Sequence, residues 1–270
     1  MTTEPDLLGA TAGICKLCLE LKPLCKSHML PKRLYARLRE ASDDENHFRV
    51  RHEDGDLKLT QRQIWAHLLC VSCEDRFNKQ GEGWVIANSA SKAGFPLADA
   101  LRSRTALNKS GALDQIYLAQ GEGVDIETLI YFPTSVVWRR SVGNWTLANR
   151  IAGEPKDFFA LGARAEEFRR YLLCQQPFPK DVSIKVEVER QEPPEPVVAV
   201  YRVPCDATLL PLRYKVLVPG IQFTLTMNVL PNGVEMMMSI VNNPVTPLIF
   251  LTSWGGSVVD EIGPLTIPEP

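Results

Sequence analysis

Two short cysteine motifs place the strongest constraint on how this chain can fold. Cys15 and Cys18 form one CxxC pair near the start of the sequence, and Cys70 and Cys73 form a second pair much further along. Structural Zn²⁺ takes four tetrahedral N or S ligands, and a CxxC turn places two thiolates at a suitable spacing. The four cysteines therefore predict a closed structural zinc site that joins the two ends of an N-terminal region.

Two other interpretations of these motifs stay open. One or both pairs could be ordinary buried thiols, and Cys25 with His28 also has ligand-like spacing, so a mixed site that uses His28 is an alternative. Disulfides explain the pairs poorly, because the sequence starts without the basic leader and apolar run of a secretory signal and reducing cytosol keeps thiols free. We expect a cytoplasmic protein without a membrane span.

Composition adds only weak limits. The 270 residues allow one or two domains, and a chain with 45% hydrophobic and 23% charged residues is ordinary for a globular protein. The net charge of -2 argues weakly against a general binder of polyanions. The segment from residue 22 to residue 39 nevertheless carries six basic residues and no acidic one. This segment is either a phosphate-facing patch or a helix with a solvated basic face.

Sequence patterns predict an α+β fold in three parts: a zinc-bound region over residues 1–90, a mostly helical region over 91–180 and an antiparallel sheet over 181–270. The first part should contain a helix over 30–39, a hairpin with strands at 47–51 and 57–60, helix-compatible sequence over 61–69 and a helix starting at residue 74. The middle part should contain helices over 125–138 and 163–174.

Alternating hydrophobicity predicts the strands of the last part. They cover residues 182–190, 197–203, 214–218, 223–230 and 234–241, with a hairpin turn at Pro231-Asn232-Gly233. The Met236-Met237-Met238 run is interpreted as part of the core. Alternatively, this β region binds a protein partner or a second copy of the chain, because apolar strand edges invite pairing.

The residues around the cysteine pairs resemble a known family. The segment Ser27–Lys32 reads SHxxPK, and Leu68–Glu74 reads LLCxxCE. Together they resemble the bacterial HNH endonuclease-like proteins. Segments 136–139 and 161–169 resemble a helical part of uncharacterised members, so the resemblance covers most of residues 15–175. It implies a zinc-clasped ββα-metal, treble-clef-like domain at the N-terminus.

The resemblance also implies roles for two residues. In HNH nucleases a histidine takes a proton from water, while a divalent cation, usually Mg²⁺, stabilises the charge on the reacting phosphate. His28 matches that base by position. Glu74 stands where the family has its closing His, directly after the last cysteine, and a carboxylate is a good oxygen ligand for Mg²⁺ or Mn²⁺. The sequence departs from the family at Ser27, where an Asp or His commonly binds the metal. It also lacks the middle Asn that the family has before the second cysteine pair.

Further candidates follow from position relative to these residues. His67 is the nearest polar substitute for the missing Asn, with packing as its alternative role. Asn78 and Glu82 follow Glu74 by four and eight residues on or near one helix face, so either could complete the metal site or be an ordinary helix-surface residue. The cations that would bind phosphate are Lys32, Arg33 and Arg37.

Three functions follow from these features. The first is a metal-dependent HNH-type endonuclease that cuts nucleic acid, with DNA favoured over RNA and with phage defence as a context implied by the resemblance. The second is a catalytically weak zinc module that binds nucleic acid or a protein partner without cutting. The third is a structural or assembly protein. The sequence has no GxxxxGK[ST], GxSxG or HExxH motif, so an ATPase, a serine hydrolase and a zinc protease have no support.

Overall fold

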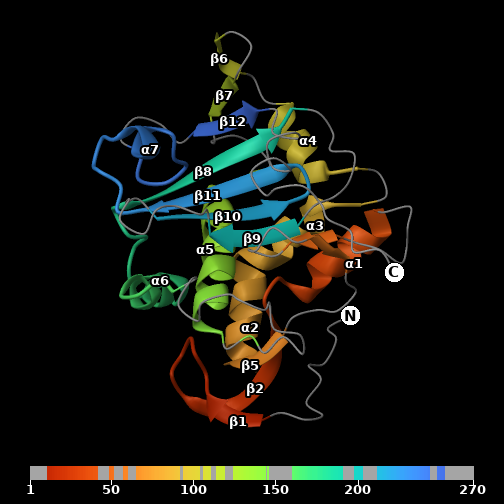
Figure 1. Ribbon diagram of the computed structural model, residues 1–270, viewed down its shortest axis with the longest axis vertical. Coiled ribbons are helices and arrows are strands. Elements are labelled where there is room, and N and C mark those ends of the chain that lie inside the picture. The colour runs from red at the N-terminus through yellow and green to blue at the C-terminus, as the bar shows by residue number, and fades with distance from the viewer. Residues whose placement is uncertain are drawn as a thin grey trace.

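The computed structural model describes residues 11–41, 49–51, 57–59, 65–91, 94–103, 106–110, 114–118, 124–143, 145, 160–190, 198–202, 212–243 and 248–252. These residues form a three-stranded sheet, a nine-stranded sheet and several helices. Figure 1 shows the small sheet at one end of the molecule, with helices between it and the large sheet. The prediction of a mixed fold of helices and strands is confirmed.

The small sheet contains β1 (Thr11–Ile14), β2 (Leu21–His28) and β5 (Trp65–Cys70), antiparallel in the order β1-β2-β5. Helix α1 (Lys32–Ala41) follows β2 and confirms the helix predicted there. The helix-compatible reading of 61–69 is wrong for its described part, because residues from Trp65 onward form β5 and pair with β2. Pairing with a neighbouring strand here overrides a weak local pattern.

The helices that position the site form two packed rods. Helix α2 (Val71–Phe77), the π-helical turn η1 (Asn78–Glu82) and α3 (Gly83–Ser89) continue one another with helical dihedral angles at both junctions. Helix α5 (Ile126–Val142) packs along this rod and is buried from residue 128 to residue 139, as expected of a helix whose sequence is mostly apolar. A Cβ on Gly81 would lie 3.2 Å from the backbone nitrogen of Phe132, so the two rods approach closely at this glycine.

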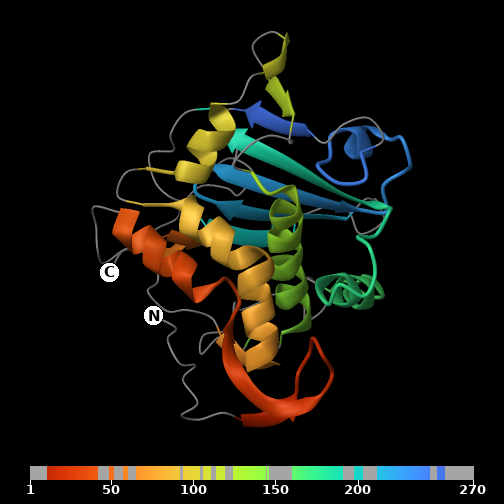
Figure 2. The same cartoon turned by 180° about the vertical axis from the view of Figure 1, so that it is seen from behind.

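Two further helices flank these rods. Helix α4 (Pro96–Arg102) lies near β8, and α6 (Arg164–Leu172) packs beside α5. The predictions of helices over 125–138 and 163–174 are confirmed by α5 and α6. Figures 1 and 2 show that the helices α3, α4 and α5 lie on one face of the large sheet.

The large sheet draws strands from all three predicted parts of the chain. Its order is β4-β3-β9-β10-β11-β8-β12-β7-β6. The strands are β3 (Arg49–Arg51), β4 (Leu57–Leu59), β6 (Ala106–Ser110), β7 (Asp114–Leu118), β8 (Val182–Glu189), β9 (Val198–Arg202), β10 (Arg213–Val218), β11 (Ile221–Met227) and β12 (Leu248–Thr252).

The pairing of these strands refines the prediction. The strands β9, β10, β11 and β8 are antiparallel neighbours, as predicted, and β3 with β4 confirms the two strands of the N-terminal hairpin. Two pairs are parallel, however, because β12 runs beside β8 and β3 runs beside β9. The sheet is therefore mixed rather than purely antiparallel, and the strands β6 and β7 interrupt the predicted helical middle.

The predicted strand over 234–241 is wrong. Residues Val234–Met237 form a short helix, α7, in which the N–H groups of Met236 and Met237 both donate to the Gly233 carbonyl. The turn at 231–233 therefore leads into a helix instead of joining two strands. Within the described ranges, no helix has the length and apolarity that a membrane crossing requires.

Candidate functional site

Four thiols gather where the small sheet meets α2. Cys15 and Cys18 lie in the turn between β1 and β2, while Cys70 ends β5 and Cys73 lies in the first turn of α2. Their sulfur atoms all lie within 4.8 Å of one another, and three of the four residues are buried. This cluster could hold a metal ion. In the described part of the chain, the group of metal-ligating side chains does not include Cys25 or His28, which line a neighbouring pocket instead.

Hydrogen bonds support the cluster. The Cys70 N–H donates to the Cys15 sulfur at 3.4 Å, and the Lys16 N–H donates to the Leu68 carbonyl at 3.1 Å, so the two cysteine-bearing segments are joined directly. A hydrogen bond from the Cys73 thiol lowers the pKa of the Cys15 thiol to about 4, with burial opposing this and backbone N–H groups assisting it. The same hydrogen bond and burial raise the pKa of the Cys73 thiol, so of this pair Cys15 is the thiolate, the form that binds metals, and Cys73 keeps its proton until a metal displaces it.

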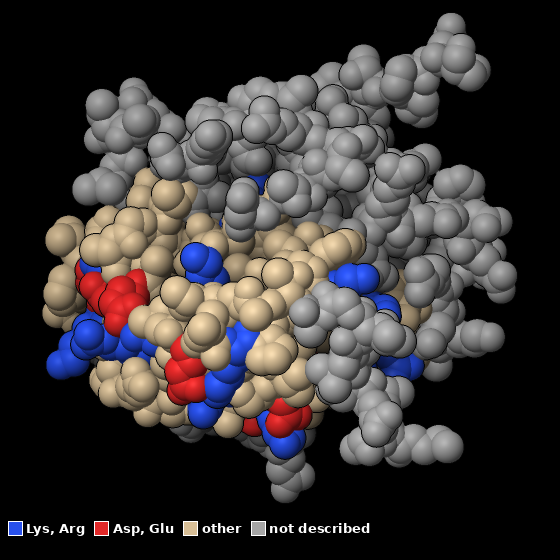
Figure 3. Space-filling view, turned by 90° about the horizontal axis from the view of Figure 1, so that it is seen from below, with Lys and Arg blue, Asp and Glu red and all other residues tan. Residues whose placement is uncertain are grey.

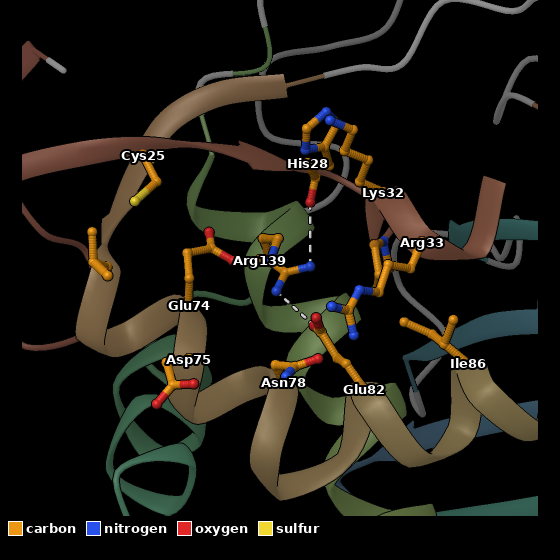
Figure 4. A pocket seen from close by; sticks show the side chains of 12 residues that line it. Cys25, His28, Lys32, Arg33, Glu74, Asp75, Asn78, Glu82, Ile86 and Arg139 are labelled. Carbon is orange, nitrogen blue, oxygen red and sulfur yellow. Dashed lines mark hydrogen bonds and ion pairs between the residues drawn. The ribbon is translucent and has the colours of Figure 1, made fainter. Parts of the chain in front are cut away.

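A pocket of about 310 Å³ opens beside the cluster (Figure 4). It lies between the end of β2, the start of α1, the α2–α3 rod and α5. Six of the residues that the sequence predicts for the site line it, namely His28, Lys32, Arg33, Glu74, Asn78 and Glu82. The pocket therefore brings together cationic, anionic and titratable groups from segments far apart in the sequence.

The rod supplies the acidic and amide groups of the pocket. Figure 4 shows Glu74, Asn78 and Glu82 projecting from successive turns. Among the described residues, the Oε1 atom of Glu74 is buried and has no hydrogen-bond partner. A buried carboxylate oxygen without a donor is uncommon in folded proteins, and an ordered water or a bound cation would satisfy it.

His28 stands at the end of β2. Burial, together with the charges of Lys32 and Arg139, lowers the pKa of its imidazole to about 4. The ring is therefore neutral near pH 7. Figure 4 shows the imidazole beside Lys32 and turned away from Glu74, whereas the backbone carbonyl of His28 points into the pocket toward Arg139.

Arg139 on α5 ties these elements together. Its side chain is 1% exposed and forms an ion pair of 2.6 Å with Glu82, which is 8% exposed. It also donates to the His28 carbonyl at 3.2 Å, and its guanidinium lies 5.0 Å from the centre of the Phe77 ring. The Ser135 hydroxyl donates to the same Glu82 oxygen at 3.2 Å. Glu82 is thus a structural partner of Arg139.

No role for Arg139 follows from the sequence motifs, although its position in the chain does indicate a buried charge. Arg139 is the first of two arginines that follow the apolar run of α5, and it lies where the helix is buried. A charged side chain at such a position needs a partner. This position therefore indicates a buried ion pair, but it does not identify Glu82 as the partner.

Other predicted residues lie outside the pocket lining. His67 lies on β5, with its Nδ1 atom 3.3 Å from the Leu24 carbonyl oxygen. Ser27 is buried and accepts a hydrogen bond of 3.1 Å from the Leu69 N–H, which joins β2 to β5. Arg37 lies one helical turn beyond Arg33 on α1 and does not line the pocket.

Comparison of the chain with protein-family models, with curated proteins and with solved structures gives no match. The function is therefore argued from the geometry of the cluster and the pocket.

Proposed function

We propose that this pocket hydrolyses phosphodiester bonds of nucleic acid, with DNA preferred over RNA, as HNH-type endonucleases do. The observation that carries the proposal is that His28, Glu74 and Asn78 line one pocket beside a cluster of four cysteines. The order β2, β5 and α2, with one cysteine pair before β2 and the other at the start of α2, agrees with a zinc-clasped, treble-clef-like ββα-metal domain.

Zinc is the metal that fits the cysteine cluster best. For a tetrahedral site with Zn–S bonds of about 2.3 Å, neighbouring sulfur atoms lie about 3.8 Å apart. The Cys18 and Cys70 sulfur atoms are 3.9 Å apart. Four thiol ligands close the site, so its role is structural: it fixes the start of β2 against the start of α2.

The pocket offers ligands for a second cation of a different kind. Carboxylate and amide oxygens suit Mg²⁺ and Mn²⁺, and Glu74 and Asn78 carry them one turn apart on the rod. Such a cation, when bound, supplies electrostatic stabilisation of the negative charge on the reacting phosphate. Glu82 is a weaker candidate ligand, because its carboxylate is held by Arg139 and Ser135.

The remaining pocket residues supply a proton acceptor and a binding site for an anion. A neutral imidazole at His28 can accept a proton from water at an unprotonated ring nitrogen. Lys32 and Arg33 present cations at the same pocket that can bind phosphate oxygens. Arg139 holds the end of β2 through the His28 carbonyl and so limits how far the imidazole can move.

A second candidate function is binding of nucleic acid or a protein partner without cleavage. Two observations favour it. The Ser27 hydroxyl is committed to the Leu69 N–H and is a poor substitute for the metal ligand that the family commonly has there. The His28 ring also lies on the Lys32 side of the pocket and not against Glu74 (Figure 4).

Cleavage assays separate the two candidates. Purified protein is incubated with supercoiled plasmid, single-stranded DNA or RNA in the presence of Mg²⁺ or Mn²⁺, and His28→Ala and Glu74→Gln are compared at equal zinc content. The matched control is Glu235→Gln, which removes a carboxylate on α7, outside the pocket lining. Loss of cleavage in the two pocket variants alone supports the proposal. If both pocket variants still cleave, the active site lies elsewhere. If the wild type binds nucleic acid without cleaving it, the second candidate function is supported.

A further inference from the structure

The face of the small sheet that carries His28 also carries an exposed tryptophan. In the pairing of β2 with β5, His28 lies opposite Trp65 and Lys26 lies opposite His67. Directly opposed residues of antiparallel strands point to the same face, and residues two apart along a strand share a face. Lys26, His28, Trp65 and His67 therefore belong to one face.

The Trp65 side chain is held in place while it stays accessible. It is 40% exposed. The Lys26 ammonium lies over one face of a Trp65 ring, 4.9 Å from its centre, and the His67 and Trp65 rings are nearly perpendicular with centroids 5.5 Å apart, so a base would stack on the opposite indole face. An ordered aromatic face next to a cation is the combination that binds unstacked nucleobases, because the base stacks on the ring and the cation meets the backbone phosphate.

The position of Trp65 relates it to the pocket. Its backbone pairs directly with that of His28, the proposed base, while its indole ring contacts Lys26 and His67. His28 also lines the pocket. A strand bound at the end of β2 would therefore meet both the pocket and Trp65.

Part of the positive charge at this end of the molecule is paired with acidic side chains. A protein that holds duplex DNA by its backbone needs several unpaired cations in a row. Figure 3 views the molecule from the small-sheet end and shows some lysines and arginines there beside acidic side chains and others apart from them. Lys22, for example, is 2.6 Å from Glu20, and Arg169 is 2.6 Å from Glu166.

We propose that Trp65 is a stacking platform for an unpaired nucleobase, with Lys26 at the neighbouring phosphate, so that the pocket takes single-stranded nucleic acid. This inference rests on the proposed function for the position of the reacting phosphate. A base inside a duplex has no free π-face to offer, so duplex substrates do not use the platform.

Binding is measured by fluorescence anisotropy on the Glu74→Gln background, with zinc bound and without added Mg²⁺ or Mn²⁺. The probes are labelled oligothymidylate, oligouridylate and a DNA duplex of the same length. Trp65→Leu keeps an apolar side chain but removes the π-face, whereas Trp65→Phe retains a smaller one. Leu21→Ala is the matched control, because Leu21 is a 76% exposed apolar residue at the far end of β2.

Trp65→Leu should weaken single-strand binding by at least about fivefold, which corresponds to the lower end of the ~1–3 kcal/mol per stacked base. Trp65→Phe should lose less, Leu21→Ala should bind like the parent, and duplex binding should not respond to any of them. The relative response of the two single-stranded probes shows whether the platform prefers DNA or RNA. Unchanged single-strand binding in Trp65→Leu, or an equal loss for the duplex, overturns the inference.

Cleavage and binding report separately on the two proposals. If the wild type cuts none of the substrates but Trp65→Leu selectively loses single-strand binding, the platform stands and the nuclease proposal fails. If the wild type cuts and binding is indifferent to Trp65, the platform fails and the nuclease proposal stands. If Trp65→Leu loses its bound zinc, the comparison with the parent is made with Trp65→Phe instead, because that variant replaces the indole by another aromatic ring.

Discussion

The ion pair between Arg139 and Glu82 allows a quantitative test of how the pocket is held together. Arg139→Met removes the cation and leaves a carboxylate that is 8% exposed, with the Ser135 hydroxyl as its described donor. Removing one partner of a buried ion pair typically costs about 3–5 kcal/mol, because the other charge stays buried without compensation. The variant also loses the bond to the His28 carbonyl, which adds about 0.5–1.5 kcal/mol.

The double variant Arg139→Met/Glu82→Leu should recover most of this loss. Replacing a whole buried pair by apolar residues is often neutral or stabilising, so we expect it to lie within about 2 kcal/mol of the wild type, the remainder being the lost His28 bond. Urea unfolding at constant excess zinc measures the three free energies. The matched control is Arg170→Met, whose partner Glu166 is at the surface and whose pair should contribute only about 0–1 kcal/mol.

The same variants predict a pH dependence. Burial raises the pKa of Glu82, and Arg139 opposes that rise. Without Arg139 the pKa rises further, so folded Arg139→Met binds the Glu82 proton more tightly than the unfolded chain does. Its stability should therefore fall as the pH rises, and its deficit relative to the wild type should be larger at pH 8 than at pH 5. A deficit no larger than that of Arg170→Met, or a double variant whose loss equals the sum of the single losses, would refute the reasoning.

Three further predictions concern single sites. The His28 ring should titrate near pH 4 when followed by NMR. Because its pKa is lowered from 6.5 to about 4, its contribution to stability should be lost as the pH falls from 6.5 to 4. A titration midpoint near 6.5 would contradict the burial of the ring. Cys70→Ser should abolish zinc binding measured by mass spectrometry, while Cys174→Ser, at an exposed cysteine outside the cluster, should retain it. Gly81→Ala should lower the free energy of unfolding in urea by about 1–3 kcal/mol, because the new Cβ meets the Phe132 backbone. The same change in an exposed helix usually raises that free energy by about 1 kcal/mol. A stabilised Gly81→Ala variant would show that the two rods can separate there.

Much of the framework could be predicted because its signals are local. The CxxC spacing predicted the four-cysteine cluster, since the ligand geometry of a metal limits where thiols can stand. Strict alternation predicted β8 and β10, and helical spacing predicted α6. In each case the pattern extends over enough residues to define one face of the element.

Features that depend on distant partners could not be predicted in this way. The strand β5 carries no alternation strong enough to outweigh a helical reading, and it becomes a strand because β2 pairs with it. The strand β12 is defined by its parallel pairing with β8. Arg139 acquires its role from Glu82, which lies on another helix. Local patterns name the candidates for such contacts but not the partners.

The π-helical turn explains how the α2–α3 rod presents Glu74 and Asn78 to the pocket and also places Glu82 against Arg139. In an α-helix each residue turns by about 100°, so Glu82, eight residues after Glu74, would drift off the face that Glu74 and Asn78 share. The Gly83 N–H donates to the Asn78 carbonyl, which is the i→i+5 bond of a wider turn with less rotation per residue. A Cβ on Gly83 would lie 2.7 Å from that carbonyl oxygen, so this wide turn requires glycine at its end. The turn brings Glu82 back toward the pocket, where it fixes Arg139 and, through the His28 carbonyl, the end of β2, while Glu74 and Asn78 stay available for a ligand.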